Sequence, residues 1–168
     1  MRAQGGDPGI SRTGNETEEM YFSATGATKV AEARLGDALL EGNYIEIKKA
    51  SSNTLNQIRA VKYITVVARD VRDESWYVIP AYEITRQVQA KPRGQHCECA
   101  FETSTLSLGN LTDFKIAGPA LLREKTLEAI AVSAQYPELE QLMKETLTAC
   151  RATADRYRAE VGVALEGL

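Results

Sequence analysis

The stretch GDALLEGNYIEIKK, residues 36–49, decides the fold of this chain. Two short apolar runs are joined at residues 41–43, Glu-Gly-Asn, which favour a turn. The pattern predicts a β-hairpin whose strands cover residues 30–40 and 43–49.

Side chains alternate across a strand, so the second strand of this hairpin presents two different faces. Glu46 and Lys48 share one face with Tyr44, and the isoleucines between them take the other. Burying either charge alone would cost roughly several kcal/mol, so we expect a metal or an ion partner nearby. Asp37, on the preceding strand, is the natural third member. Two converging carboxylates make a hard-oxygen site of the kind that Mg²⁺ takes.

The bulk composition is that of one globular domain. The chain has 168 residues, of which 43% are hydrophobic and 26% charged. It contains no apolar run of about 18 residues, so we expect no membrane-spanning helix. The polar N-terminus lacks a signal-peptide core, and three cysteines do not make a disulfide framework. These features predict a cytoplasmic protein.

The charge is distributed unevenly along the chain. Residues 1–43 have a formal net charge of −3, residues 44–95 of +4, and residues 96–168 of −4. The positive segment begins at the strand with Glu46 and Lys48. This is a modest local signal for a phosphate-bearing partner.

The remaining elements predict a mixed α/β chain. We expect a flexible leader over residues 1–13, an α/β core over 14–118 and a C-terminal helical hairpin over 119–168, packed on the core or at a dimer interface. Within the core, the patterns predict helices over residues 15–24 and 53–62 and strands over 63–68, 76–79 and 99–101. Pro119 and Pro137 stand at helix N1 positions and introduce the predicted helices 120–135 and 138–163.

The triplet Glu46-Ile47-Lys48 has a counterpart in Asp113-Phe114-Lys115. Chance gives roughly one acid–x–lysine triplet in a chain of this composition, so the spacing alone carries little weight. The second triplet stands between glycines in a polar turn and is typical of a solvated loop.

The arrangement of Glu18, Gly36-Asp37 and Glu46-Ile47-Lys48, followed by a helix with Asn56 and Gln57, resembles the core of the PD-(D/E)XK nuclease superfamily. That group includes restriction endonucleases, homing endonucleases and Holliday-junction resolvases. The resemblance covers about residues 14–80, with Gly36 in place of the motif's proline. It implies a restriction-endonuclease-like core, a mixed central sheet flanked by helices.

The resemblance assigns Asp37 and Glu46 as ligands of Mg²⁺, for which Mn²⁺ would substitute. Glu18 would be an outer ligand or bind a second metal, with Glu19 as the alternative. Lys48 would lie beside the attacking water and the scissile phosphate, where an ammonium group stabilises developing negative charge. The metal would acidify water and offset charge on phosphorus. The competing interpretation of this set is a surface ion-pair cluster.

Further residues are candidates for contact with nucleic acid. Gln57 would touch the scissile phosphate, and Arg59 and Lys62, on the same predicted helix, would contact other phosphates. Arg93, Gln95 and the only histidine, His96, stand in a polar loop that would enter a DNA groove. The competing interpretation of each is an ordinary solvated surface.

The run His96-Cys97-Glu98-Cys99 invites a zinc hypothesis, but no second ligand pair exists in the chain. Cys97 and Cys99 are more simply two residues on the same face of a buried strand.

These observations favour an Mg²⁺-dependent endonuclease acting on double-stranded DNA, sequence-specific in the manner of restriction or homing enzymes. Cutting both strands would require a homodimer, with residues 120–163 as one interface. The alternatives are a Holliday-junction resolvase-type nuclease, a non-cleaving nucleic-acid-binding protein on the same fold, and a helical interaction module whose acids are merely solvated.

Overall fold

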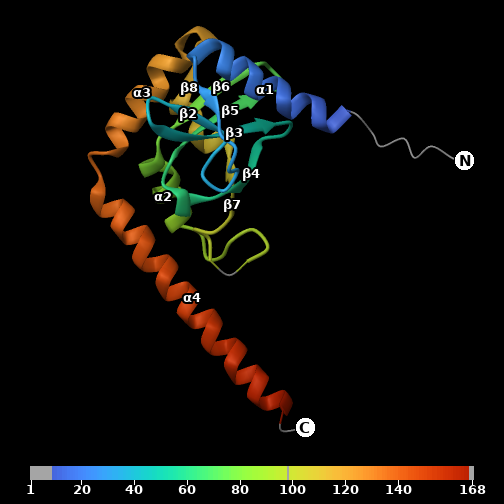
Figure 1. Ribbon diagram of the computed structural model, residues 1–168, viewed down its shortest axis with the longest axis vertical. Coiled ribbons are helices and arrows are strands. Elements are labelled where there is room, and N and C mark those ends of the chain that lie inside the picture. The colour runs from blue at the N-terminus through green and yellow to red at the C-terminus, as the bar shows by residue number, and fades with distance from the viewer. Residues whose placement is uncertain (1–8, 98, 167–168) are drawn as a thin grey trace, which may run out of the picture.

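The centre of the molecule is a six-stranded sheet, seen in a computed structural model that describes residues 9–97 and 99–166 (Figure 1). The strand order is β1-β2-β3-β5-β6-β8, and β3 and β5 are parallel while the other neighbours are antiparallel. The predicted mixed α/β class with a helix-flanked sheet is therefore confirmed. The strands are β1 (Thr28–Lys29), β2 (Ala38–Leu40), β3 (Asn43–Ala50), β5 (Thr65–Asp70), β6 (Ser75–Ile79) and β8 (Lys115–Ile116).

The hairpin β2–β3 forms as predicted around the turn at residues 41–43, with Ala38 opposite Ile45 and Leu40 opposite Asn43. Its second strand has the expected two faces. Ile45 and Ile47 lie in an apolar cluster on one side of the sheet. Glu46 and Lys48 therefore project from the opposite side.

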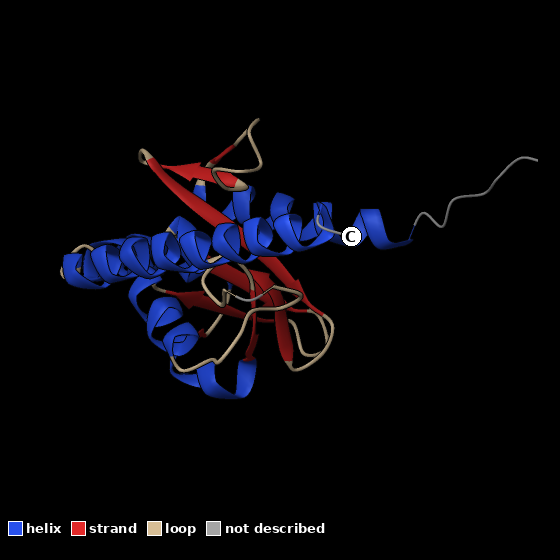
Figure 2. Cartoon of the chain, turned by 90° about the horizontal axis from the view of Figure 1, so that it is seen from below, coloured by secondary structure: helices blue, strands red, loops and turns tan. Residues whose placement is uncertain are grey.

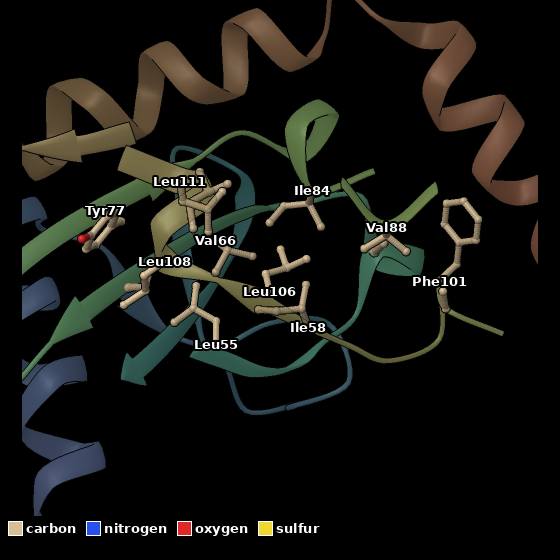
Figure 3. Close-up of a cluster of buried hydrophobic side chains, with 14 of the residues drawn as sticks. Leu55, Ile58, Val66, Tyr77, Ile84, Val88, Phe101, Leu106, Leu108 and Leu111 are labelled. Carbon is tan, nitrogen blue, oxygen red and sulfur yellow. The ribbon is translucent and has the colours of Figure 1, made fainter. Parts of the chain in front are cut away.

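The cluster around Ile45 is covered by α1 (Gly9–Thr25) and α3 (Leu122–Ser133), the latter preceded by the short 3-10 helix η3 (Pro119–Leu121). The opposite face is covered by α2 (Ala81–Gln89), by the first half of α4 (Pro137–Glu166), by the 3-10 helix η2 (Leu108–Phe114) and by a separate two-stranded ribbon. Figure 3 shows the apolar side chains that this second layer places against Val66 of the sheet.

The ribbon consists of β4 (Thr54–Ile58) and β7 (Ser104–Ser107), which pair antiparallel. The predicted helix over residues 53–62 is thus wrong, since only the short 3-10 helix η1 (Ala60–Lys62) is helical there. A shift of register between Leu55 and Ile58 explains the error. A bulge turns two residues that are three apart toward the same face, which imitates helical spacing.

Several other boundaries differ from the prediction. Helix α1 begins at Gly9, so residues 9–13 are helical, whereas residues 1–8 of the predicted leader lie outside the described part. The predicted strand over residues 30–40 is reduced to β2, because bends and a turn occupy residues 31–37. The strand expected over residues 99–101 is irregular, and α2 was not predicted.

The two C-terminal helices form but do not pair as a hairpin within the described residues. Helix α3 packs on α1 and the sheet, whereas α4 packs on α2 and η1. Figure 1 shows α4 leaving the domain after its first turns, and Figure 2 shows it lying across the molecule. No helix in the described part is apolar over enough residues to cross a membrane.

Candidate functional site

The carboxylate of Asp37 is fixed at the seam between β2 and β3. Its backbone N–H donates to the Ile45 carbonyl at 2.9 Å, and its Oδ2 accepts the N–H of Ile47 at 2.7 Å. Asp37 lies just before β2, whose register begins with Ala38 opposite Ile45, and its carboxylate binds the backbone of β3 between Glu46 and Lys48. The hairpin thus brings together the two acids that the sequence singled out.

Gly36 makes this approach possible. A Cβ added there would lie 3.0 Å from the Ile45 carbonyl oxygen and 3.3 Å from Cβ of Tyr44. A larger residue would therefore require the chain and β3 to shift by a few tenths of an ångström. The position preceding Asp37 thus favours glycine.

Glu46 is held by two lysines. Its Oε1 lies 2.8 Å from Nζ of Lys48 and its Oε2 lies 2.7 Å from Nζ of Lys62. The side chains of Glu46, Lys48 and Lys62 are 9%, 21% and 10% exposed, respectively, so the cluster is largely buried. Lys62 also donates to the carbonyl of Ala33 at 3.3 Å, which ties η1 to the segment before Asp37. An ion partner for Glu46 was expected, and here it is a pair of ammonium groups.

The two acids have pKa shifts of opposite sign. Burial raises the pKa of Asp37, and the charges of Glu46 and Glu18 add to the effect, while the Ile47 N–H and Lys48 partly offset it. Burial would also raise the pKa of Glu46, but the charges and hydrogen bonds of Lys48 and Lys62 outweigh it and hold that pKa below its ordinary value. Divergent pKa values in neighbouring carboxyls are common at functional sites.

The structure distinguishes Glu18 from Glu19. Glu18 is half-buried, lies near enough to act on Asp37 electrostatically, and pairs with Lys29 at 3.5 Å. Glu19 is exposed and lines a separate hollow with Met20 and Pro119. Of these two acids, only Glu18 therefore lies close to Asp37.

The carboxylate oxygens of this site are ligands of the chemical type that Mg²⁺ binds. In the described part of the chain, no three His, Cys, Asp or Glu side chains lie close enough together to hold a metal. Magnesium often uses one or two carboxylates and leaves its other positions to water and substrate phosphate. Asp37 and Glu46 match that pattern, and Glu18 stands further out.

The predicted nucleic-acid residues are only partly brought to this site. Gln57 lies in β4 rather than on a helix, and its backbone N–H donates to Oε1 of Gln95 at 2.8 Å. Arg59, Arg93 and His96 are exposed on the surface. Most of the predicted nucleic-acid residues thus lie at or near the ribbon: Gln57, Arg59, Gln95 and the loop with Arg93 and His96. Of the predicted set, only Lys62 reaches the carboxylates.

Lys62 is the residue whose role the sequence did not reveal. It was expected to contact phosphate from a helix, but it is an ion partner of Glu46. The contact depends on the turn that η1 makes after the bulged strand, and no local pattern encodes that turn. The one feature of the sequence that pointed to this contact was the need of a buried Glu46 for an ion partner.

The second triplet and the cysteines lie elsewhere. Asp113 is exposed, and Lys115 pairs with Asp73 at 3.1 Å. Cys97 and Cys99 are free thiols, and the Sγ of Cys97 contacts the carbonyl of Cys99 at 3.1 Å. No zinc-type ligand group is present in the described residues.

Comparison of the chain with protein-family models, with curated proteins and with solved structures gave no significant match.

Proposed function

We propose that the protein is a metal-dependent endonuclease that hydrolyses phosphodiester bonds of double-stranded DNA, with a restriction-endonuclease-like core of the PD-(D/E)XK type. The observation that carries the proposal is that the Asp37 carboxylate binds the N–H of Ile47, between Glu46 and Lys48, whose side chains pair at 2.8 Å on one face of β3. Chance spacing does not explain why these three residues meet at a largely buried point of the sheet.

Asp37 and Glu46 would hold Mg²⁺ or Mn²⁺, with Glu18 further out, and the ion would supply acidity to water and positive charge beside the phosphate. The protein's own part is positioning. The Ile47 N–H orients the Asp37 carboxylate, and the two lysines orient Glu46.

Lys48 has the role of orienting and stabilising the substrate phosphate. Its ammonium lies at the more exposed end of the cluster, with a 21% exposed side chain, whereas that of Lys62 is 10% exposed. A positive group fixed beside the reacting phosphate stabilises negative charge as it develops. Lys62 instead holds Glu46 from the η1 side and fixes the Ala33 segment.

The test is nicking of supercoiled plasmid by purified protein with Mg²⁺, and with EDTA as the metal-free control. We expect nicking by wild type and a loss of at least about 100-fold in rate for Glu46→Ala and for Lys48→Ala. Cleavage that survives both changes would refute the assignment.

A non-cleaving nucleic-acid-binding protein is the second candidate. It is favoured by the saturation of Glu46, whose two oxygens both carry a lysine partner. A gel shift of duplex DNA in the absence of any metal-dependent nicking would support this candidate over the first. Absence of both activities would favour a helical interaction module.

The proposal includes a homodimer and sequence-specific cutting in the manner of restriction or homing enzymes, with a Holliday-junction resolvase as the structure-specific alternative. One site per chain cuts one strand, so a two-strand cut requires two copies. Discrete bands from a linear substrate would indicate sequence reading, and preferential cutting of four-way junctions would indicate a resolvase.

A further inference from the structure

The outer face of the β4–β7 ribbon is polar and rich in side-chain amides. The inner face is apolar, and Figure 3 shows Leu55, Ile58 and Leu106 pointing into the core. On the outer side Asn56 and Gln57 are exposed, and Oδ1 of Asn56 accepts a hydrogen bond from the Thr105 hydroxyl at 3.2 Å. The ribbon's packing therefore leaves its amides facing outward.

The backbone at Gln57 is held in an unusual conformation. Its φ is +54°, which is uncommon for a residue with a side chain, and the register of β4 shifts at the same place. The exposed N–H of Gln57 is bound by the Gln95 amide from the loop after α2. The bulge and this hydrogen bond hold the backbone of Gln57, whose own side-chain amide forms no hydrogen bond within the described residues.

The charge around the ribbon differs from that of the rest of the chain. Residues 51–62 and 84–112, which include the ribbon and the segment between α2 and β7, contain five Lys or Arg against two Glu, whereas the other residues hold 15 Lys or Arg against 21 Asp and Glu. Of these cations, Arg59, Lys91 and Arg93 have no ion-pair partner in the described part of the chain. Figure 1 shows the chain after α2, over residues 90–97, extending beyond the ribbon.

We propose that the outer face of the β4–β7 ribbon enters the major groove of duplex DNA and that Asn56 and Gln57 determine sequence specificity there. The choice of DNA as partner rests on the proposed function. The major groove of B-form DNA admits a two-stranded β-ribbon, and the amides of Asn and Gln pair with the N6 and N7 edge of adenine. Arg59, Lys91 and Arg93 flank the ribbon and contact phosphates.

The distance to the carboxylate cluster fits this arrangement. Gln57 precedes Lys62 by five residues, so their Cα atoms are at most about 18 Å apart. Lys62 in turn lies 2.7 Å from Glu46. Because the side chains of Lys62 and Gln57 add to this span, the bases that Gln57 reads would lie within about one helical turn, about 34 Å, of the bond that is cut.

The experiment is selection from a randomised duplex DNA library by the full chain in EDTA, so that binding is measured without cleavage. The ribbon variant combines Asn56→Ala with Gln57→Gly, since glycine adopts a positive φ without strain. The matched control combines Gln135→Ala with Gln141→Ala, two exposed amides outside the ribbon. Melting followed by circular dichroism verifies that each variant is folded.

We expect wild type and the control to enrich sequences with A·T pairs at fixed positions. The ribbon variant should bind the unselected library within about threefold of wild type, because the phosphate contacts remain. The preference of the ribbon variant for the selected sequences over the unselected library should fall by roughly 5- to 150-fold for each base pair that an amide contacts in wild type. An RNA duplex should not displace the selected DNA, since its deep major groove excludes a ribbon.

Enrichment of the same sequences by the ribbon variant and by wild type would overturn the proposal. Wild-type protein that binds DNA without enriching any sequence, or that does not bind DNA, would also overturn it. So would displacement of the selected DNA by duplex RNA as readily as by duplex DNA. Nicking without enrichment would refute the ribbon's role alone, and enrichment without nicking would refute the nuclease alone.

Discussion

Asp37, just before β2, is close enough to Glu46 in β3 for their charges to interact, yet their surroundings shift their pKa values in opposite directions. Burial dominates at Asp37, whose carboxylate has one hydrogen-bond partner among the described residues, the backbone N–H of Ile47. At Glu46 two lysines outweigh burial. The site therefore contains one carboxylate, that of Glu46, whose charge is compensated, and one, that of Asp37, whose charge is costly. A cation bound at Asp37 would reverse that cost.

The first prediction follows from the sign of each shift. The raised pKa of Asp37 stabilises the fold below the ordinary value of 3.8, and this contribution is lost as pH rises through the folded value. Asp37→Asn, which retains an acceptor for the Ile47 N–H, should thus raise the melting temperature of the metal-free protein at pH 7. The gain should shrink toward pH 3. A lower melting temperature for this variant at pH 7 would contradict the burial argument.

Glu46 should behave in the opposite way. Its lowered pKa stabilises the fold above the ordinary value of 4.5, and this contribution is lost as pH falls through the folded value. Glu46→Gln leaves two lysines without a counter-charge, so the free energy of unfolding should fall by roughly 3 kcal/mol at pH 7. Urea unfolding at pH 7 and pH 3 measures both effects, and equal losses at the two pH values would argue against the ion pairs as the cause.

The strand β3 was predictable at the scale of single residues, whereas the partner of Glu46 was not. Alternation alone places Glu46 and Lys48 on one face, because the period of a strand is independent of the rest of the fold. Lys62 reaches the same point only through tertiary structure.

Among the secondary-structure elements, the β2–β3 hairpin depends on the absence of a side chain at Gly36. In Gly36→Ala, the new Cβ would meet the Ile45 carbonyl at 3.0 Å, so the backbone on one side would have to shift by a few tenths of an ångström. We expect a loss of roughly 1–3 kcal/mol in unfolding free energy, and reduced nicking because Asp37 moves. Gly118→Ala is the matched control, since nothing lies within 4 Å of its added Cβ. Equal melting temperatures for the two variants would exclude a role for the close approach.

Helix α4 is attached to the domain by one face of its first half. Met143 is 1% exposed and the adjacent Leu142 is 37% exposed. Met143→Ala should lower the free energy of unfolding by roughly 2–5 kcal/mol, whereas Leu142→Ala should change it by only about 0.5 kcal/mol. Denaturant titration of both variants measures the difference, and similar losses would mean that α4 does not pack as described.

The ribbon shows why some elements resist prediction from sequence. Leu55, Ile58 and Val61 recur at helical spacing, but a bulge at Asn56 and Gln57 produces the same inward pattern from a strand. The helix α2 follows Pro80 directly and places Ile84 and Val88 in the core. That spacing of four was available in the sequence, but the segment is short and its polar residues conceal it.

For the whole molecule, the proposed two-strand cut predicts self-association. Sedimentation equilibrium at micromolar protein with a cognate duplex should give a protein mass near twice 18.4 kDa. A complex containing one chain, together with cleavage of both strands, would contradict the requirement for a symmetric pair.

The most direct measurement compares the two acid–x–lysine triplets in one nicking experiment. The variants Glu46→Gln and Lys48→Met alter the buried triplet, and Asp113→Asn and Lys115→Met make the matching changes in the surface triplet. In Mg²⁺, we predict that the first pair loses at least about 100-fold in plasmid-nicking rate, because each removes a charge at the reacting phosphate or its metal. The second pair should cut at the wild-type rate. Equal rates for all four variants, or no Mg²⁺-dependent nicking by the wild-type protein, would contradict the proposed site.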